Sequence, residues 1–433
     1  MMSNNSDPQR EPIASATPIR ILQIIDRLNI GGPAKHMVWL TQGLNNGQHR
    51  SRLITGSCAE GEGDMTYLAR QSGIDLLVIP QMSRELGLQD LVVLWRLLRE
   101  MWRWQPDVIH THKSKAGAVG RVAACIYKWL TPSALWLRPR RCRVIHTFHG
   151  HIFHSYYGPM KTRLFIAIER LLARLCTDRI ITISRQQRQE ICEEFQVGRP
   201  EQHRMVPLGI ELSEIATDQA FREELRASED ELLVGIVGRL SEVKNHAMFL
   251  ASAAEFLRGN STSRRCRFVI VGDGHLRSDL ERQAGQLHIA GQVVFTGFRH
   301  DTMRLYSSFD VVALTSLNEG TPVTLIEAMA CGRAVVSTEV GGVVDLMGAR
   351  EDHQDGFTVW ENGITVRKGD SQGLARALRY LVDRPELSRQ MGARGCAYIN
   401  ANFSRERLLR DTAGVYQEAW HTRILPPLAA AQI

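Results

Sequence analysis

The sequence lacks the patterns that mark several classes of protein. Its eight cysteines are scattered, with no C-x-x-C pair, in a chain of 433 residues that needs no disulfide framework. This argues for reduced thiols, as in a cytoplasm. No apolar run reaches the length of a membrane span. Residues 1–18 have no apolar core, so we expect a disordered tail rather than a signal peptide or an anchor.

Metal-binding patterns are also missing. No D-x-D dyad, the common carboxylate platform for a nucleotide-bound divalent ion, occurs in the sequence. Four histidines lie close together (His146, His149, His151 and His154), but their spacing suits neither a helical pair nor the usual loop ligands of a metal. We therefore expect no metal and no other cofactor.

The net charge of +7 has several explanations. A basic protein suits an anionic substrate, an anionic membrane surface or a nucleic acid. None of the signatures of DNA-binding or RNA-binding modules appears. We therefore expect no nucleic-acid partner, and the anionic substrate and the membrane surface stay open.

The chain is too long for a single core, and two domains of about 200 residues are the natural division. Two series of short apolar runs alternate with helical patterns, one from Arg20 and one from Leu232. This alternation predicts an α/β protein with two doubly wound parallel sheets. Residues 197–210 have the glycine and proline content of a hinge, so we expect domains at 19–205 and 206–403. Residues 359–368 are expected to be irregular.

The second series contains the most informative unit, a predicted strand–helix–strand. Residues 311–316 and 334–338 are apolar, β-branched runs of the length that buried parallel strands need. Between them, Thr321 is expected to cap a helix, with Pro322 at its first position. Cys331-Gly332 is expected to end the helix.

The start of that helix predicts an anion site. Its unpaired backbone N–H groups point beyond the carboxyl end of the preceding strand, a position that suits phosphate. Glu319 lies in the turn and Glu327 lies on the helix, and carboxylates accept hydrogen bonds from sugar hydroxyls. A nucleotide-sugar, a diphosphate between two polyols, would satisfy all these groups. An ordinary βαβ unit with two solvated glutamates is the alternative.

Other strand ends carry further candidates. Arg239 and Lys244 bracket the turn after strand 232–237, as a planar fork and a point charge would around a diphosphate. Gly31-Gly32 opens a helix and lets backbone approach a ligand, although taken alone a plain tight turn is the favoured interpretation. His149 follows strand 144–148 and is expected to reach a ligand, whereas packing is favoured for His146, His151 and His154.

With these residues in place, the chain resembles the retaining nucleotide-sugar glycosyltransferases of family 4, which have the GT-B architecture of two facing Rossmann-like domains. The resemblance runs from about Arg20 to Trp420. Its most specific part is EGTPVTLIE, the E-x7-E element, followed by GRLSEVKN and TFHGHIFH. HTHKSKAG is similar to members that build bacterial surface polysaccharides.

The resemblance implies roles for the candidate residues. Arg239 and Lys244 would hold the donor diphosphate, Glu319 would contact the donor sugar, and Glu327 would accept the ribose hydroxyls. The catalytic set would be Glu319, His149, Arg239 and Lys244. The donor-binding set would be Gly32, Arg239, Lys244, Phe298, Arg299, Glu319, Gly320, Thr321, Pro322, Val323 and Glu327. For Phe298 and Arg299 a plain turn is equally consistent with the sequence. The family's last helix typically crosses back to the first domain, and residues 404–420 are expected to form it.

The expected reaction is transfer of a sugar, with retention, from a nucleotide-diphosphate-sugar to a glycan or a polyprenyl-diphosphate-linked saccharide. Resemblance alone favours uridine as the base. Tryptophans and arginines between residues 129 and 143 suit either an anionic membrane interface or a solvated loop. The protein would then be cytoplasmic or peripheral on the inner face of the cytoplasmic membrane. A nucleotide-sugar 2-epimerase and a non-catalytic nucleotide-sugar-binding protein are the alternatives.

Overall fold

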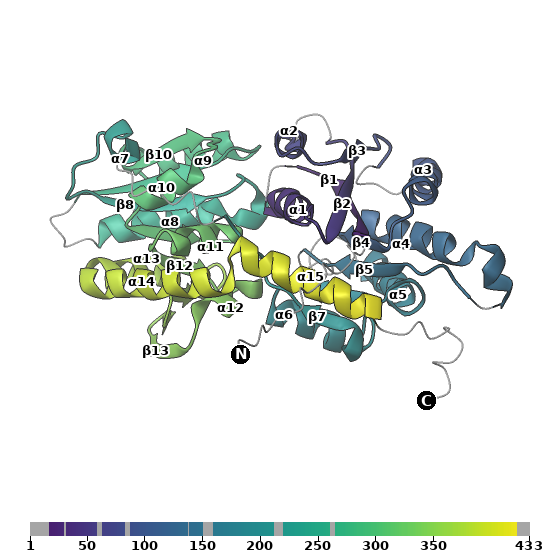
Figure 1. The fold of residues 1–433 in the computed structure, drawn as a ribbon. Coiled ribbons are helices and arrows are strands. Elements are labelled where there is room, and N and C mark those ends of the chain that lie inside the picture. Colours follow the sequence, from purple (N-terminus) through teal and green to yellow (C-terminus); the bar gives the residue numbers. More distant parts are fainter. Residues whose placement is uncertain are drawn as a thin grey trace, which may run out of the picture.

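The computed structural model describes residues 17–29, 32–58, 63–82, 87–136, 138–149, 159–211, 220–259 and 265–421. These residues form two α/β domains, each built around one sheet (Figure 1). The predicted fold class is therefore confirmed. None of the helices in the described ranges is long and apolar enough to span a membrane.

The first domain contains a seven-stranded parallel sheet in the order β3-β2-β1-β4-β5-β6-β7. Its elements are β1 (Ile19–Arg27), α1 (Gly32–Gly43), β2 (His49–Gly56), α2 (Thr66–Gln71), β3 (Leu76–Val78), α3 (Gln89–Trp104), β4 (Val108–His112), α4 (Ser114–Trp129), β5 (Arg143–Thr147), α5 (Pro159–Cys176), β6 (Arg179–Thr182), α6 (Arg185–Arg188) and β7 (His203–Met205). The order reverses between β1 and β4, and ligands of such sheets bind at this switch point.

The second domain contains an eight-stranded sheet in the order β10-β9-β8-β11-β12-β15-β14-β13, with its switch point between β8 and β11. Its elements are α7 (Ala220–Glu224), β8 (Leu232–Val237), α8 (His246–Arg258), β9 (Cys266–Val271), α9 (Arg277–Gln286), β10 (Val293–Gly297), α10 (Thr302–Ser308), β11 (Val311–Leu314), α11 (Val323–Ala330), β12 (Ala334–Thr338), α12 (Val344–Met347), β13 (Arg350–Gln354), β14 (Phe357–Trp360), β15 (Ile364–Val366), α13 (Ser371–Val382) and α14 (Pro385–Asn402).

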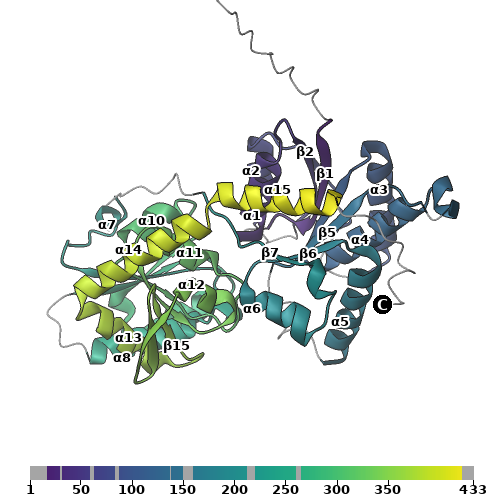
Figure 2. The same ribbon diagram turned by 60° about the horizontal axis from the view of Figure 1, so that its bottom comes forward.

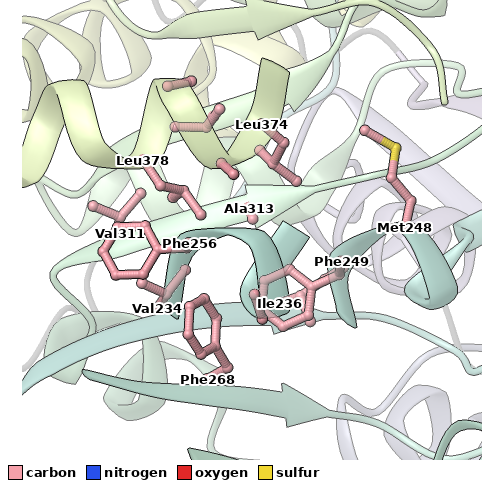
Figure 3. Packing of buried hydrophobic residues seen from close by; sticks show 14 of the residues in the cluster. Val234, Ile236, Met248, Phe249, Phe256, Phe268, Val311, Ala313, Leu374 and Leu378 are labelled. Atoms are coloured by element: carbon pink, nitrogen blue, oxygen red, sulfur yellow. The ribbon is translucent and has the colours of Figure 1, made fainter. Parts of the chain in front are cut away.

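Burial on both faces explains why the strands are continuous apolar runs. Val234 and Ile236 of β8 pack on one face against α8 and α13, where Phe249 and Leu378 lie (Figure 3). The neighbouring Leu233 points to the other face and packs with α10 and α11. A strand covered by helices on both sides has no polar face, so its side chains do not alternate in polarity.

The prediction that residues 359–368 are irregular was wrong. β14 and β15 form an antiparallel hairpin, in which the N–H of Trp360 donates to the carbonyl of Gly363 at 2.9 Å. The two strands are only four and three residues long, too short for an apolar periodicity to appear. The Asn362-Gly363 turn was the signal available in the sequence.

The last helix, α15 (Arg405–His421), leaves the second domain and lies against the first (Figures 1 and 2). Val415 and Tyr416 are buried in a cluster with Ile21 of β1 and Leu40 of α1. At the crossing, the N–H of Ile210 donates to the carbonyl of Phe403 at 2.8 Å. Two chain segments therefore pass side by side between the domains.

Candidate active site

The starts of two helices, one from each domain, meet at the centre of the molecule. Gly32 begins α1, and a Cβ atom at this position would lie 2.6 Å from Cγ2 of Val323, the first residue of α11. Glycine therefore allows an approach that any side chain would obstruct. Gly31, also named in the predicted loop, lies outside the described residues.

The cap of α11 differs from the prediction. Pro322 is the N-cap residue, with φ −74° and ψ 104°, and Thr321 precedes it. The Thr321 hydroxyl lies 3.5 Å from the carbonyl oxygen of Ile183, at the end of β6, rather than over the helix N–H groups. No side-chain cap covers the first turn of α11. The predicted end is confirmed, because Cys331 is the C-cap and Gly332 has φ +68°.

Glu319 is held at the entrance to this helix by two donors. Lys244 Nζ lies 2.6 Å from Oε1 of Glu319, and the Ser316 hydroxyl donates to the same oxygen at 2.6 Å. Both the ammonium and the carboxylate are largely buried, with 23% and 11% of their side chains exposed. The pair joins the turn after β8 to the turn after β11. The two residues were predicted from the sequence to belong to one site, and they are in contact.

Arg239 lies beside this pair, at the end of β8. Its side chain is exposed and has no hydrogen-bond or ion-pair partner among the described residues. The Thr324 hydroxyl, in the first turn of α11, donates to the carbonyl of Val237 at 3.3 Å. The aliphatic part of Lys244 lies over Gly238. The segment that carries Arg239, the Lys244 ammonium and the start of α11 therefore lie together.

Glu327 contacts the other domain. Its Oε1 lies 3.4 Å from Nζ of Lys35, which is on α1. The Glu327 side chain is 11% exposed, and its charge together with burial raises the pKa of the neighbouring Tyr306 phenol. Lys35 was not among the residues predicted for the site. Its place in the first turn of α1, three residues after Gly32, was the feature of the sequence that could have suggested it.

Arg299 is occupied by partners within its own domain. Its guanidinium forms bidentate hydrogen bonds with Glu224 and Asp301, at distances between 2.8 and 3.1 Å. These bonds raise the pKa of Arg299. The Arg299 side chain therefore stabilises its own domain. The neighbouring Phe298 ring is half-exposed and is accessible to a ligand. A role for Phe298 at the edge of a base stays a prediction.

On the first domain, four histidines from β4 and β5 and the residues after them lie close together with His36 of α1. The four are His110, His112, His146 and His149. His149 Nε2 lies 2.9 Å from His112 Nδ1, and His112 Nε2 lies 2.9 Å from Oε1 of Gln23 on β1. His110 bonds the Tyr416 hydroxyl and the Thr147 hydroxyl, both at 2.7 Å. The ring of His36, on α1, stands edge-on to His149, with centroids 5.2 Å apart.

Burial keeps these histidines neutral. Desolvation lowers the pKa of His36 to about 4 and that of His110 to about 3, and it lowers the pKa of His112 and His149 well below the ordinary value. His146 is also buried and bonds Thr111, as predicted for a packing residue. His151 and His154 lie outside the described residues. Within the described ranges, no three His, Cys, Asp or Glu side chains group to hold a metal ion.

Comparisons with known proteins agree for both halves of the chain. Residues 31–209 match the family model described as "Glycosyl transferase 4-like domain", and residues 217–397 match the one described as "Glycosyl transferases group 1". A UDP-Gal:alpha-D-GlcNAc-diphosphoundecaprenol alpha-1,3-galactosyltransferase of Escherichia coli is 28% identical over 330 residues, which are 74% of this chain and 79% of the relative. The putative glycosyltransferase EpsD of Bacillus subtilis is 27% identical over 76% of this chain and 81% of its own.

Solved structures share the fold. Anabaena Alr3699/HepE, in complex with UDP, has a TM-score of 0.72 at 21% identity and covers 93% of this chain and 100% of its own. WaaG, a glycosyltransferase involved in lipopolysaccharide biosynthesis, has a TM-score of 0.63 at 16% identity, with 93% and 98% covered. At such identities the likeness concerns the arrangement of the two domains.

Proposed function

Because the chain belongs to family 4 of the glycosyltransferases and has their GT-B architecture, we propose that it transfers a sugar from a UDP-sugar to a lipid-linked saccharide. The transfer proceeds with retention at the anomeric carbon and without a metal ion. The observation that carries this proposal is the convergence of Arg239, Lys244 and the start of α11 on one region between the domains.

These three groups suit the departing diphosphate. Negative charge develops on its oxygens as the bond to the sugar breaks, and fixed cations and helix N–H groups stabilise that charge. The unpaired guanidinium of Arg239 is available for a bidentate contact. Lys244 is held by Glu319 and therefore needs no large rearrangement. One such donor contributes on the order of 3 kcal/mol to the transition state.

The two carboxylates suit the two polyols that flank a diphosphate. In Glu319, Oε1 accepts hydrogen bonds from Lys244 and Ser316. In Glu327, Oε1 accepts from Lys35. Oε2 of each is then available to a sugar hydroxyl. Glu319 lies before α11 and contacts the transferred sugar, whereas Glu327 lies a turn along the helix and contacts the ribose.

Retention in this site needs no protein base. The acceptor hydroxyl attacks the anomeric carbon on the face from which the diphosphate departs, and its proton passes to the departing diphosphate oxygen. The bond between the anomeric carbon and the new oxygen replaces the bond to the phosphate oxygen. The neutral His149 is therefore available to bind a hydroxyl rather than to act as a base.

A lipid-diphosphate acceptor is supported by the Escherichia coli relative, whose name gives a diphosphoundecaprenol acceptor. One face of the first domain suits the membrane that carries such lipids. Helix α3 exposes Leu91, Val92, Trp95 and Trp102, with Leu88 at its N-cap, and α5 exposes Met160, Leu164, Leu171 and Leu175. Exposed cations lie among them (Arg99, Arg103, Lys161, Arg163 and Arg174).

This apolar and basic face of α3 and α5 supports membrane binding better than the segment 129–143. Trp136 is exposed, but the Arg140 and Arg141 guanidinium groups lie over the rings of Tyr127 and Trp420, at 4.4 and 4.1 Å. Arg143 pairs with Asp178. Helices α3 and α5 lie on either side of α4, on the side away from the second domain (right in Figure 1). Amphipathic surfaces rich in arginine bind anionic bilayers.

The donor test is a screen of UDP-, GDP- and ADP-sugars by saturation-transfer NMR, followed by mass spectrometry of lipid-linked saccharides made with the best donor. Extension of the lipid-linked saccharide by one sugar, with release of UDP, is the expected result. Formation of an epimeric sugar nucleotide without any acceptor would instead indicate an epimerase. Donor binding without any product would indicate a non-catalytic binding protein.

The membrane test is co-sedimentation with vesicles that contain phosphatidylglycerol. The double variant Leu91→Ser/Trp95→Ser should release most of the protein from the vesicles, because both side chains are exposed on α3. Tyr67→Ser on α2 removes another exposed aromatic group and is the matched control. Equal binding by all three proteins would rule out this face.

A further inference from the structure

The hydrogen-bonded chain Gln23–His112–His149 runs beneath the region between the domains. Gln23 is on β1 and His112 ends β4, so the two residues lie on the neighbouring strands of the switch point. Both side chains are fully buried, and both contacts are 2.9 Å long. None of the roles proposed above uses Gln23 or His112.

The donor and the acceptor of each hydrogen bond in this series can be assigned. The Oε1 atom of Gln23 only accepts, so His112 Nε2 carries a proton and donates it. A neutral His112 then has an unprotonated Nδ1, which accepts from Nε2–H of His149. His149 is therefore left with an unprotonated Nδ1. That atom is buried and has no hydrogen-bond partner among the described residues.

We propose that Gln23 and His112 are positioning residues that fix His149 as its Nε2–H tautomer, so that its Nδ1 accepts a hydrogen bond from a hydroxyl of the transferred sugar. The inference rests on the proposed function. It adds which atom of His149 contacts the sugar and that this atom accepts the hydrogen bond. A buried acceptor without a partner is unfavourable, and a ligand hydroxyl relieves that cost.

The surroundings of His149 support a position beside the proposed donor site. His36, whose ring stands edge-on to His149, belongs to α1, the helix whose first residue meets α11. Burial, His36 and then the charge of the nearby Lys113 lower the pKa of His149. Lys113 is itself paired with Asp26 at 2.9 Å, so His149 is the neutral acceptor in this group.

The contact with His112 is the one that orients the Gln23 amide. The Gln23 side chain lies near the phenol of Tyr416, on α15, and that phenol oxygen bonds His110. The Gln23 Nε2 atom is buried and has no hydrogen-bond partner among the described residues. The amide oxygen therefore holds the position that His112 Nε2–H requires.

The first test is spectroscopic and uses the wild-type protein labelled with ¹⁵N-histidine. Long-range ¹⁵N–¹H correlation should show the Nε2–H tautomer for His149, assigned by comparison with His149→Ala. Addition of the UDP-sugar should shift the Nδ1 resonance, whereas UDP alone should not. An Nδ1–H tautomer in wild type would overturn the inference, and so would an Nδ1 resonance that the UDP-sugar leaves unmoved.

The second test compares two substitutions of the same residue. Gln23→Met removes the acceptor but keeps the shape, so kcat should fall about tenfold, the effect of one hydrogen bond to a neutral group, with an unchanged dissociation constant for UDP. Gln23→Glu keeps an acceptor and should restore most of kcat and the tautomer. Equal kcat in Gln23→Met and wild type, with the tautomer retained, would overturn the inference.

Deoxygenated donors identify the hydroxyl. Wild type should discriminate against one deoxy position of the sugar, and Gln23→Met should lose most of that discrimination. If no sugar transfer is found while the tautomer and its response to the UDP-sugar are as expected, the proposed function fails and this inference stands. The opposite tautomer in an active enzyme rejects this inference alone.

Discussion

The two domains present different chemistry to the region between them. The second domain contributes charged groups that are partly exposed, Arg239 and the pair Lys244–Glu319. The first domain contributes neutral rings, of which the buried His112 and the partly buried His149 are hydrogen-bonded to each other. Partial exposure lets a cation keep its charge, whereas full burial removes the charge of a histidine. One domain therefore stabilises charge, and the other recognises uncharged hydroxyls.

The largest effect is expected from removing a charge on the second domain. Lys244→Ala should lower kcat/KM by about 100-fold or more, because the departing diphosphate loses one fixed cation. It also leaves Glu319 without its cation, so UDP should bind more weakly in calorimetry. Lys368→Ala, which removes an exposed lysine of the same domain, is the control. Equal rates for the two variants would contradict the division between the domains.

Acid should destabilise the first domain before the second. Below pH 6.5 unfolded histidines bind a proton, while His36, with a pKa of about 4, and His110, with a pKa of about 3, stay neutral in the fold. The unfolded state then binds more protons, so the unfolding free energy decreases as the pH falls from 6.5 to 4.5, by about 2 kcal/mol for each such histidine.

Hydrogen exchange at pH 7 and at pH 5 measures this difference. Amides of β4 and β5 should lose protection before those of β8 and β11. The second domain has one comparable histidine, His246, whose pKa burial lowers to about 4. Simultaneous loss of protection in both sheets would show that the histidine cluster does not set the acid stability.

The contact between the two helix starts should respond to a single methyl group. Gly32→Ala would place a Cβ 2.6 Å from Val323 Cγ2, so the domains must separate slightly or the valine must move. We expect kcat to fall about tenfold, with little change in thermal stability. Val323→Ala should restore much of the rate in the double variant. A double variant as slow as Gly32→Ala would indicate that backbone, rather than Val323, is the obstacle.

The smallest effect is expected for the ion pair that joins the domains. Lys35→Met keeps the aliphatic stem but removes the 3.4 Å contact with Glu327. The pair is long and its lysine is partly exposed, so it contributes little and KM for the donor should rise about two- to threefold. Raising the salt concentration should weaken donor binding more in wild type than in Lys35→Met. A large loss of kcat would instead assign Lys35 to the reaction.

The sequence was informative wherever a local pattern determined the structure. Strand 232–237 appears at the predicted residues, and Lys244 and Glu319 meet because each follows a buried strand of one sheet. Parallel strands bring their carboxyl ends to one edge, so residues far apart in sequence become neighbours. The fold class follows from the same alternation of strands and helices.

Contacts between elements were not predictable in this way. The Lys35–Glu327 pair joins two domains, and Gln23 reaches His112 only because β1 lies beside β4. Strand order and domain orientation, which no local pattern contains, decide both. Thr321 was predicted as a cap because its residue type favours that position, yet the carbonyl of Ile183 on the other domain is its contact.

The crossing helix α15 has a consequence for how the protein is made. Val415, Tyr416 and Ala419 complete the core around β1, although the 199 residues from 206 to 404 lie between β7 and α15. When the residues of the first sheet have left the ribosome, the helix that covers part of that domain's core has not yet been synthesised. That domain cannot reach its final stability during translation until residue 419 has emerged, and the second domain is free to fold first.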